Sequence, residues 1–163
     1  METGTGLAMS DKPTVEFDLA RFTPYRLALV AQRLSELLAR QYRDEFGISI
    51  PDWRVLVHLA HSGGASVRDI EARVAMEKSR VSRTCTRLES RGLIAKQAHA
   101  SDKRLVDLTL TDRGHALMAD LLPLAAAFQA EVEIRLGTEF DKLEAGIDRI
   151  LETFDPVAPH GKT

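Results

Sequence analysis

The stretch from Ser66 to Arg104 restricts the possible folds of this chain more than any other. In it, two short helical patterns follow each other almost without a gap. The first pattern begins at Ser66, and Asp69 completes a capping box with Asp in place of the more usual Glu. Its apolar positions recur at intervals of three and four residues, at Val67, Ile70 and Val74. The stretch predicts a helix-turn-helix followed by a β wing.

The second helix is predicted from Glu77 to Arg91. Its apolar or small positions, Val81, Cys85 and Leu88, lie on one stripe. The positions that project away from this stripe are Ser79, Arg80, Ser82, Arg83, Thr86 and Arg87. Gly92 follows as the residue that ends the helix, because glycine accepts the left-handed conformation needed there. The helix therefore presents arginine and hydroxyl groups outward.

Arginines and hydroxyls on one exposed helix face suit DNA for a chemical reason. The planar guanidinium bridges the N7 and O6 acceptors of guanine, and short hydroxyls reach bases or phosphates in the major groove. The alternative is a charged surface helix that faces only water. The short preceding helix, the tight turn and the wing together favour DNA binding.

The wing is predicted from two runs that alternate between apolar and polar residues, 93–97 and 105–110. Antiparallel strands are expected there, and residues 98–103 between them form the wing tip. Thr111 is expected to cap the helix that follows.

At this point the chain resembles the multiple antibiotic resistance regulator (MarR) type of winged-helix transcription factor. The resemblance is carried by Lys78–Arg83, Leu88–Ile94 and Asp102–Gly114, and it extends over about residues 25–154. It implies a mainly α fold with a small β wing, which is a winged helix-turn-helix with long dimerisation helices at both ends. It also implies that the second helix enters the major groove, that Arg104 reaches the minor groove, and that Asp102 helps to hold the wing.

We expect the DNA contacts to divide by chemistry. The second helix contributes Ser79, Arg80, Ser82, Arg83 and Arg87 to the major groove, with Thr86 on the same face. Lys78, Lys96 and Lys103 are expected at phosphates, which position a protein without specifying the sequence. Two such helices in a dimer enter successive major grooves about one helical turn or ~34 Å apart, so the operator is expected to be an inverted repeat of double-stranded DNA.

The charge of the chain is unevenly distributed. Residues 66–104 carry ten Lys and Arg against five Asp and Glu, which gives +5. Residues 1–65 carry seven basic and eight acidic side chains, and residues 105–163 carry five and eleven, so the whole chain has a net charge of −2. Positive charge is concentrated at the predicted DNA-reading motif, and the protein is expected to approach DNA with one face.

A chain of 163 residues is long enough for one domain with a helical extension. We expect flexible tails at 1–22 and 155–163 and a single domain at 23–154. Within the domain, we expect dimerisation helices at 23–47 and 111–154 and a winged helix-turn-helix lobe at 51–110.

Several finer expectations concern the helices outside the motif. Thr23 and Pro24 are expected as the cap and first residue of the first helix. The inner stripe of the second is expected to contain Trp53, Leu56, Val57 and Ala60. Pro123 is expected to kink the long helix that follows the wing, and Thr138 with Asp141 to cap the last helix. The apolar stripes of the terminal helices favour a two-fold dimer over coverage of the chain's own core.

Family members commonly bind small aromatic acids or phenolics in a cleft between the dimer helices and the winged lobe. The resemblance implies Tyr25, Arg26, Trp53 and His58 as residues of such a cleft. The plainer alternative is that Trp53 belongs to the core and Arg26 to the charged surface. The runs 24–27 and 50–55 are similar to a subgroup that responds to aromatic acids or their coenzyme A thioesters. We therefore expect release of a repressor from DNA by such a compound.

Other functions lack support in the residues. No nucleophile with a base and no pair of carboxylates indicates an enzyme, and no cofactor is expected. His58 and His61 have a spacing that suits a metal site, but without cysteine or carboxylate partners we favour surface residues. Cys85 lies on the inward stripe, which favours a core thiol over a redox sensor.

A single cysteine excludes an intrachain disulfide. There is no recognisable signal peptide, and no apolar run reaches the ~18 residues that a membrane span requires. A cytoplasmic protein is expected. Two alternatives to the ligand-responsive regulator stay open: a redox-sensing regulator that acts through Cys85, and a helical adaptor dimer that does not bind DNA.

Overall fold

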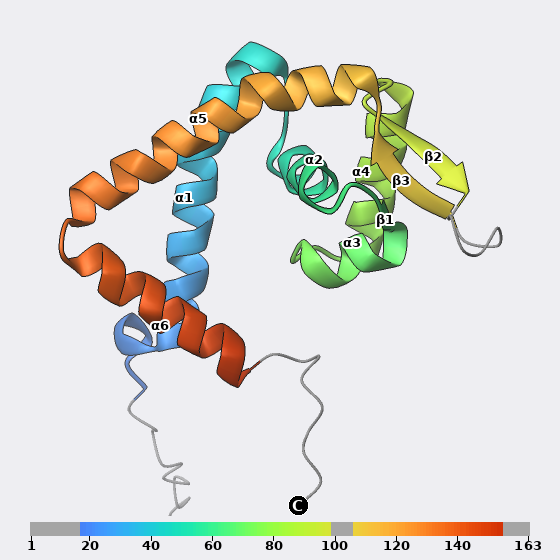
Figure 1. Cartoon of the computed structure of the whole chain (residues 1–163). Helices are drawn as coiled ribbons and strands as arrows, with labels where there is room; N and C mark the ends of the chain where they lie inside the picture. Colours follow the sequence, from blue (N-terminus) through green and yellow to red (C-terminus); the bar gives the residue numbers. More distant parts are fainter. Residues whose placement is uncertain (1–16, 99–105, 155–163) are drawn as a thin grey trace, which may run out of the picture. The chain divides into compact units, whose positions relative to one another are not determined.

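The structure is a computed structural model that describes residues 17–98 and 106–154 (Figure 1). Helices dominate, and three short strands form one antiparallel sheet in the order β1-β3-β2. The elements in chain order are a 3-10 turn η1 (Leu19–Arg21), α1 (Thr23–Phe46), α2 (Ile50–Ser62), β1 (Ala65–Ser66), α3 (Val67–Arg73), α4 (Lys78–Ser90), β2 (Ile94–Ala98), β3 (Val106–Leu110), α5 (Asp112–Leu136) and α6 (Glu139–Thr153). The fold class is thus mainly α with a small β wing, as the sequence predicts.

The chain forms two compact units, and the boundary between them falls within α1, after residue 34. In the first unit, the Asp18 side chain accepts a hydrogen bond from the Ala20 amide at 3.0 Å and caps η1. The rings of Phe17 and Phe22 meet edge to face at 5.1 Å between centroids. Residues 17–22, predicted as the end of a flexible tail, therefore form an ordered turn, and residues 1–16 lie outside the described residues.

The second unit contains the winged helix-turn-helix. In its sheet, Ile94 pairs with Leu110 and Lys96 with Leu108, while Ala65 of β1 pairs with Leu108 from the other side. The strand β1 was not predicted, because two residues carry no alternation that a sequence pattern can show. The largest fully buried side chains are Tyr42, Ile48, Leu56, Leu59, Ile70, Leu88, Ile94, Leu108 and Leu121.

Two predicted helix boundaries in this lobe are confirmed in detail. Ser66 and Asp69 form the reciprocal capping box of α3, with the Ser66 hydroxyl 2.6 Å from the carboxylate. At the end of α4, Gly92 has a φ of 68°, and its amide donates to the Glu89 carbonyl while the Leu93 amide donates to the Leu88 carbonyl. This paired arrangement is a Schellman motif, which turns the chain sharply from α4 into β2.

The inner face of α2 differs from the prediction. Val55, Leu56 and Leu59 are fully buried, whereas Trp53, Val57 and Ala60 are only half-buried. The predicted residues do pack against the core, but the buried face is wider and also includes Val55 and Leu59. It is wider because α2 packs against both α4 and β3.

Three expectations for the flanking helices had mixed outcomes. Thr111 caps α5 by accepting a hydrogen bond from the Gly114 amide at 3.1 Å, which confirms the prediction. Thr138 has helical backbone angles and its side chain makes no capping hydrogen bond, so the predicted cap with Asp141 is wrong. Thr23 is the first helical residue of α1 rather than its cap, which places Pro24 at the second position.

The helix α5 runs through Pro123 without interruption, and its axis bends along its length in Figure 1. Such a bend is expected because proline lacks the amide hydrogen and its ring collides with the preceding turn. In the part of the chain that the structure describes, no helix combines the length and apolar character needed to cross a membrane.

Candidate nucleic-acid interface

The helix α4 is held by the core along one side only. Val81, Thr84, Cys85 and Leu88 are buried at intervals of three or four residues, as the predicted stripe requires. The side chains expected at DNA on this helix are all exposed: Lys78, Ser79, Arg80, Ser82, Arg83, Thr86 and Arg87. A rigid helix therefore presents a continuous polar and basic face.

Among the arginines of this face, Arg80 and Arg83 are free of partners within the described residues. Both line a hollow of about 470 Å³ toward α2 and a second one of about 380 Å³ toward the turn between α3 and α4. Within the described part of the chain, neither guanidinium takes part in a hydrogen bond or an ion pair. Their donors are available to an external acceptor.

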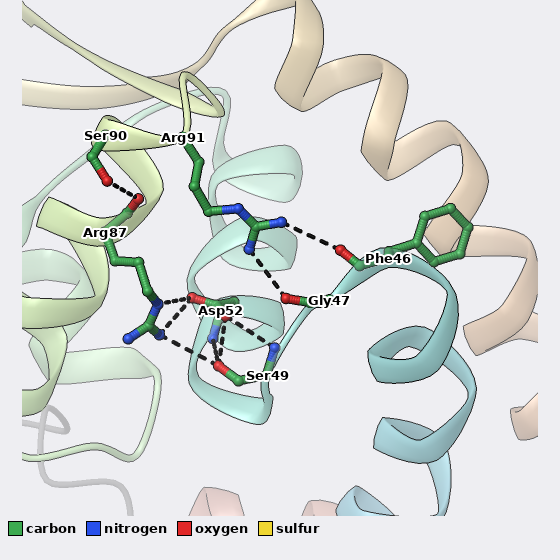
Figure 2. Close-up of polar contacts among 7 residues, drawn as sticks. All are labelled: Phe46, Gly47, Ser49, Asp52, Arg87, Ser90 and Arg91. Carbon is green, nitrogen blue, oxygen red and sulfur yellow. Dashed lines mark hydrogen bonds and ion pairs between the residues drawn. The ribbon is translucent and has the colours of Figure 1, made fainter.

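Arg87 has a different environment (Figure 2). Its Nη2 lies 2.7 Å from Oδ1 of Asp52, and its Nε lies 3.2 Å from the same oxygen. The other carboxylate oxygen accepts hydrogen bonds from the amide and the hydroxyl of Ser49, at 2.9 and 2.6 Å. Asp52 is 2% exposed. Arg87 was expected to contact a base, and the structure places it as a tie between α4 and the capping box of α2.

Arg91 extends this tie to the end of α1. Its Nη1 donates to the Gly47 carbonyl at 3.2 Å and its Nη2 to the Phe46 carbonyl at 3.3 Å (Figure 2). Carbonyls at a helix end lack partners within the helix and carry partial negative charge, so a guanidinium satisfies both needs. Arg87 and Arg91 thus fasten the second half of α4 to the corner between α1 and α2.

Two further predicted contact residues have intramolecular partners. The Thr86 hydroxyl donates to the Ser82 carbonyl at 3.1 Å, one turn earlier in α4. Lys96 of β2 forms an ion pair with Glu89 at 3.0 Å, in which both side chains are more than one-third exposed. An exposed pair of this kind contributes little stability, so Lys96 can exchange Glu89 for a phosphate at small cost.

The turn that precedes α4 is held from α2. Ala75 has a φ of 50°, the left-handed region that a residue with a Cβ seldom occupies. Nη1 of Arg54 donates to the Ala75 carbonyl at 3.1 Å. The start of α4 therefore has its own contact with α2, separate from the ties at its end.

The wing is described only in its strands. Asp102, Lys103 and Arg104, predicted at the wing tip and in the minor groove, lie outside the described residues. The strands β2 and β3 pair antiparallel, as the two runs predict, and Figure 1 shows them extending from the lobe beside α4.

The four residues expected at an effector lie in different environments. Tyr25 and Arg26 are exposed on the part of α1 that belongs to the first unit. Trp53 stacks on Tyr42, with 5.6 Å between ring centroids and 17° between planes. His58 lines a hollow of about 480 Å³ with His61, with Arg73 of α3 and with the turn after α3, and Trp53 takes no part in that lining.

The histidines and the cysteine are placed as follows. Burial lowers the pKa of His58, and the positive charge of Arg73 lowers that pKa further. Among the residues described, no group of three or more His, Cys, Asp and Glu is placed to hold a metal ion. Cys85 is buried, and that burial raises the pKa of its thiol to about 11. Since the thiolate is the reactive form, a neutral buried thiol belongs to the core rather than to a sensor.

Sequence reasoning missed the residues that hold α4 in place: Asp52, Arg54 and Arg91. The spacing of Ser49 and Asp52 is a capping signature that does appear in the sequence. Its partner Arg87 is 35 positions away, so no local pattern identifies the pair.

Comparison with known proteins identifies this arrangement. The sequence pattern of the MarR family matches residues 46–105. The transcriptional repressor MdtR of Bacillus subtilis is 31% identical over 99 residues, which are 61% of this chain and 63% of that protein, so the chain spans less than two-thirds of its length.

Solved structures are similar over most of the chain. A MarR family transcriptional regulator from Silicibacter pomeroyi is 30% identical, with a TM-score of 0.72 and coverage of 83% of this chain and 89% of that one. Sco3205, a MarR family regulator from Streptomyces coelicolor whose structure is in complex with DNA, is 27% identical, with a TM-score of 0.71 and coverage of 90% and 94%.

Proposed function

Since the chain belongs to the MarR family of DNA-binding transcriptional regulators, we propose that it acts as a homodimeric repressor on an inverted-repeat operator. In this proposal, a small aromatic acid, a phenolic compound or an aromatic acyl-CoA releases it from DNA. A single MarR-type domain at 23–154 and a cytoplasmic location are parts of the same proposal.

One observation supports this proposal most strongly. The guanidinium groups of Arg80 and Arg83 project from an exposed helix face and have no intramolecular partner in the described part of the chain. Free arginines on a helix held by its opposite side suit bidentate contacts with guanine. We assign base contacts to these two residues together with Ser79 and Ser82.

The remaining contacts are proposed from side-chain chemistry and, for the wing tip, from the resemblance to the family. We assign Lys78, Lys96 and Lys103 to phosphates. Arg104 is assigned to the minor groove, with Asp102 supporting the wing. Arg87 acts mainly through Asp52, and Thr86 stays at the edge of the interface because its hydroxyl is bonded within α4.

A repressor is favoured because MdtR, which is 31% identical over the matched region, carries that description. A homodimer is favoured by the large apolar side chains exposed on the last two helices. They include Ile134, Leu151 and Phe154, which are 80%, 64% and 75% exposed. Apolar area of this extent on terminal helices is typical of a surface covered by a second copy.

Release by an effector requires a shift between two dimer states. A compound that binds better to the state with the wrong separation of the α4 helices weakens DNA affinity by the same factor. The proposed effector residues are Tyr25, Arg26, Trp53 and His58.

The test is operator binding with the DNA that flanks the protein's own gene, titrated against salt and repeated with 4-hydroxyphenylacetate and with phenylacetyl-CoA. A steep loss of affinity with salt and release by a ligand are expected. Tight binding without release by either compound would refute these effectors. No binding at low salt would favour the adaptor dimer over the repressor.

A further inference from the structure

Three hollows on the winged-helix lobe adjoin one another. The hollow beside α2 and the one beside the turn share Arg80 and Arg83 as lining residues. The hollow beside the turn and the one that contains His58 share Arg54 and Ala75. We call this row of three adjoining hollows the basic groove; its lining runs from the exposed face of α4 past the turn to α2 and α3.

The lining of this groove is strongly cationic. It contains six arginines, namely Arg54, Arg73, Arg80, Arg83, Arg87 and Arg91, and also two histidines. The acidic residues of the lining are Glu77 and Asp52, and the carboxylate of Asp52 is neutralised by Arg87. The groove thus extends the positive charge of α4 well beyond the helix itself.

The far end of the groove has a cation placed for an external anion. Arg73 is exposed in the last turn of α3, and it has no hydrogen bond or ion pair within the described residues. Asp69, one turn earlier on the same helix, has its carboxylate engaged by the amide and the hydroxyl of Ser66 at 3.2 and 2.6 Å, and the nearby charges of Arg73 and Arg68 also lower its pKa. His61 is exposed beside it, and the floor consists of Val57 and the buried Val74.

We propose that Arg73, with His61 and Arg54 beside it, binds the sugar-phosphate backbone of the DNA whose major groove α4 enters. The inference rests on the proposed DNA-binding function and adds a second contact region on a different helix. Continuity of the groove with Arg80 and Arg83 favours DNA over a separate small anion, because one duplex spans adjoining cationic surfaces. A phosphate contact strengthens binding to every sequence equally.

The experiment compares the full-length protein with Arg73→Ala, Arg73→Lys and a matched exposed control, Arg149→Ala on α6. Binding to an operator duplex and to a scrambled duplex of equal length is measured across a range of KCl concentrations. For Arg73→Ala, the slope of log affinity against log salt is expected to become shallower by about 0.9, the value for one phosphate contact. Both affinities are expected to fall by the same factor, so that the specificity ratio is unchanged.

Arg73→Lys is expected to keep the slope because a lysine still pairs with phosphate, and Arg149→Ala is expected to match the wild type. Unchanged affinities and slope for Arg73→Ala would overturn the inference and leave this end of the groove to a small organic anion. Loss on the operator alone would also overturn it, since that result indicates a base contact. If the wild type binds neither duplex, the proposed function itself is wrong.

Discussion

A single buried carboxylate, that of Asp52, holds α4 in position through Arg87. Asp52 ends inside the lobe with both oxygens occupied, one by Arg87 and the other by Ser49. A buried charge that loses its partner costs free energy, because water cannot replace the lost contact. Arg87 therefore acts mainly by fixing the position of α4 through its ion pair with Asp52.

We predict that Arg87→Ala and Asp52→Ala each lower the free energy of unfolding by about 1–3 kcal/mol, the usual cost of an unmet buried hydrogen bond to a charged group. The double variant is expected to lose little more than Asp52→Ala alone. Asp52→Ala removes both the ion pair and the hydrogen bonds with Ser49, and Arg87 has no ion pair left to lose. Urea denaturation measures all three. Arg83→Ala, on the same helix but exposed, is the control and should change stability by less than about 0.5 kcal/mol. Additive losses in the double variant would contradict the coupling.

The buried thiol of Cys85 should make stability depend on pH in the alkaline range. Burial raises the pKa of its thiol from the ordinary value of 9.0 to about 11, so the unfolded chain loses this proton at lower pH than the folded protein does. The stabilisation that the buried Cys85 thiol contributes is therefore fully present below pH 9. It is lost as the pH rises from 9 to 11, and the loss is about 2 kcal/mol.

Denaturation at pH 8 and pH 10.5 measures this loss, and Cys85→Ala should show a smaller one. The native thiol should also react slowly with a maleimide at pH 7.5 until denaturant is added. Rapid reaction of the folded protein would contradict the core assignment and support the redox-sensing regulator.

At the scale of elements, the sequence predicted the helices and the wing better than their packing. The stripe of Val81, Cys85 and Leu88 is confirmed. It could be predicted because a helix with one buried face has apolar residues at every third or fourth position. Short elements without a period, β1 and η1, were missed. The buried face of α2 was predicted too narrow, without Val55 and Leu59, because its packing partners come from distant parts of the chain.

The candidate site divides in the same way. That α4 presents arginines outward follows from periodicity alone. Which arginines remain free does not, because the partners of Arg87 and Arg91 lie 35 or more positions away. Local spacing contains no information about such distant pairs. The structure was needed to distinguish the free Arg80 and Arg83 from Arg87 and Arg91, which have partners.

The start of α5 packs closely against the backbone at Leu93. A Cβ on Gly114 would overlap the carbonyl of Leu93, at the junction of α4 and β2. We predict that Gly114→Ala lowers the free energy of unfolding by about 1–3 kcal/mol because backbone must move to admit the methyl group. Thermal or urea denaturation measures the change.

Gly146→Ala in α6 is the matched control, since nothing lies within 4 Å of its Cβ. This substitution should raise stability by about 0.5–1 kcal/mol, the gain from replacing glycine within a helix. A neutral Gly114→Ala would show that α5 does not need this close approach.

At the scale of the whole molecule, charge and apolar surface are separated along the chain. The motif region carries +5, whereas residues 105–163 carry −6 and expose large apolar side chains. The proposed function assigns the first region to DNA and the second to contact with another copy of the chain.

We predict that Leu151→Asp weakens dimerisation by at least about tenfold, because an unpaired charge buried at an interface costs more than 1.4 kcal/mol. Sedimentation velocity across a concentration series measures the shift. Glu144→Ala on the same helix should leave the dimer unchanged. A wild type that stays monomeric at micromolar concentration would refute the dimer.

In the proposed function, Arg80 and Arg83 of α4 read the DNA sequence. Fluorescence anisotropy of the wild type and of Arg83→Ala, each with the operator and with a scrambled duplex, measures whether they do. The wild type is expected to prefer the operator by about 10³-fold or more. Arg83→Ala should lose about 1–3 kcal/mol on the operator and much less on the scrambled duplex. An equal loss on both duplexes, or no preference in the wild type, would contradict the claim.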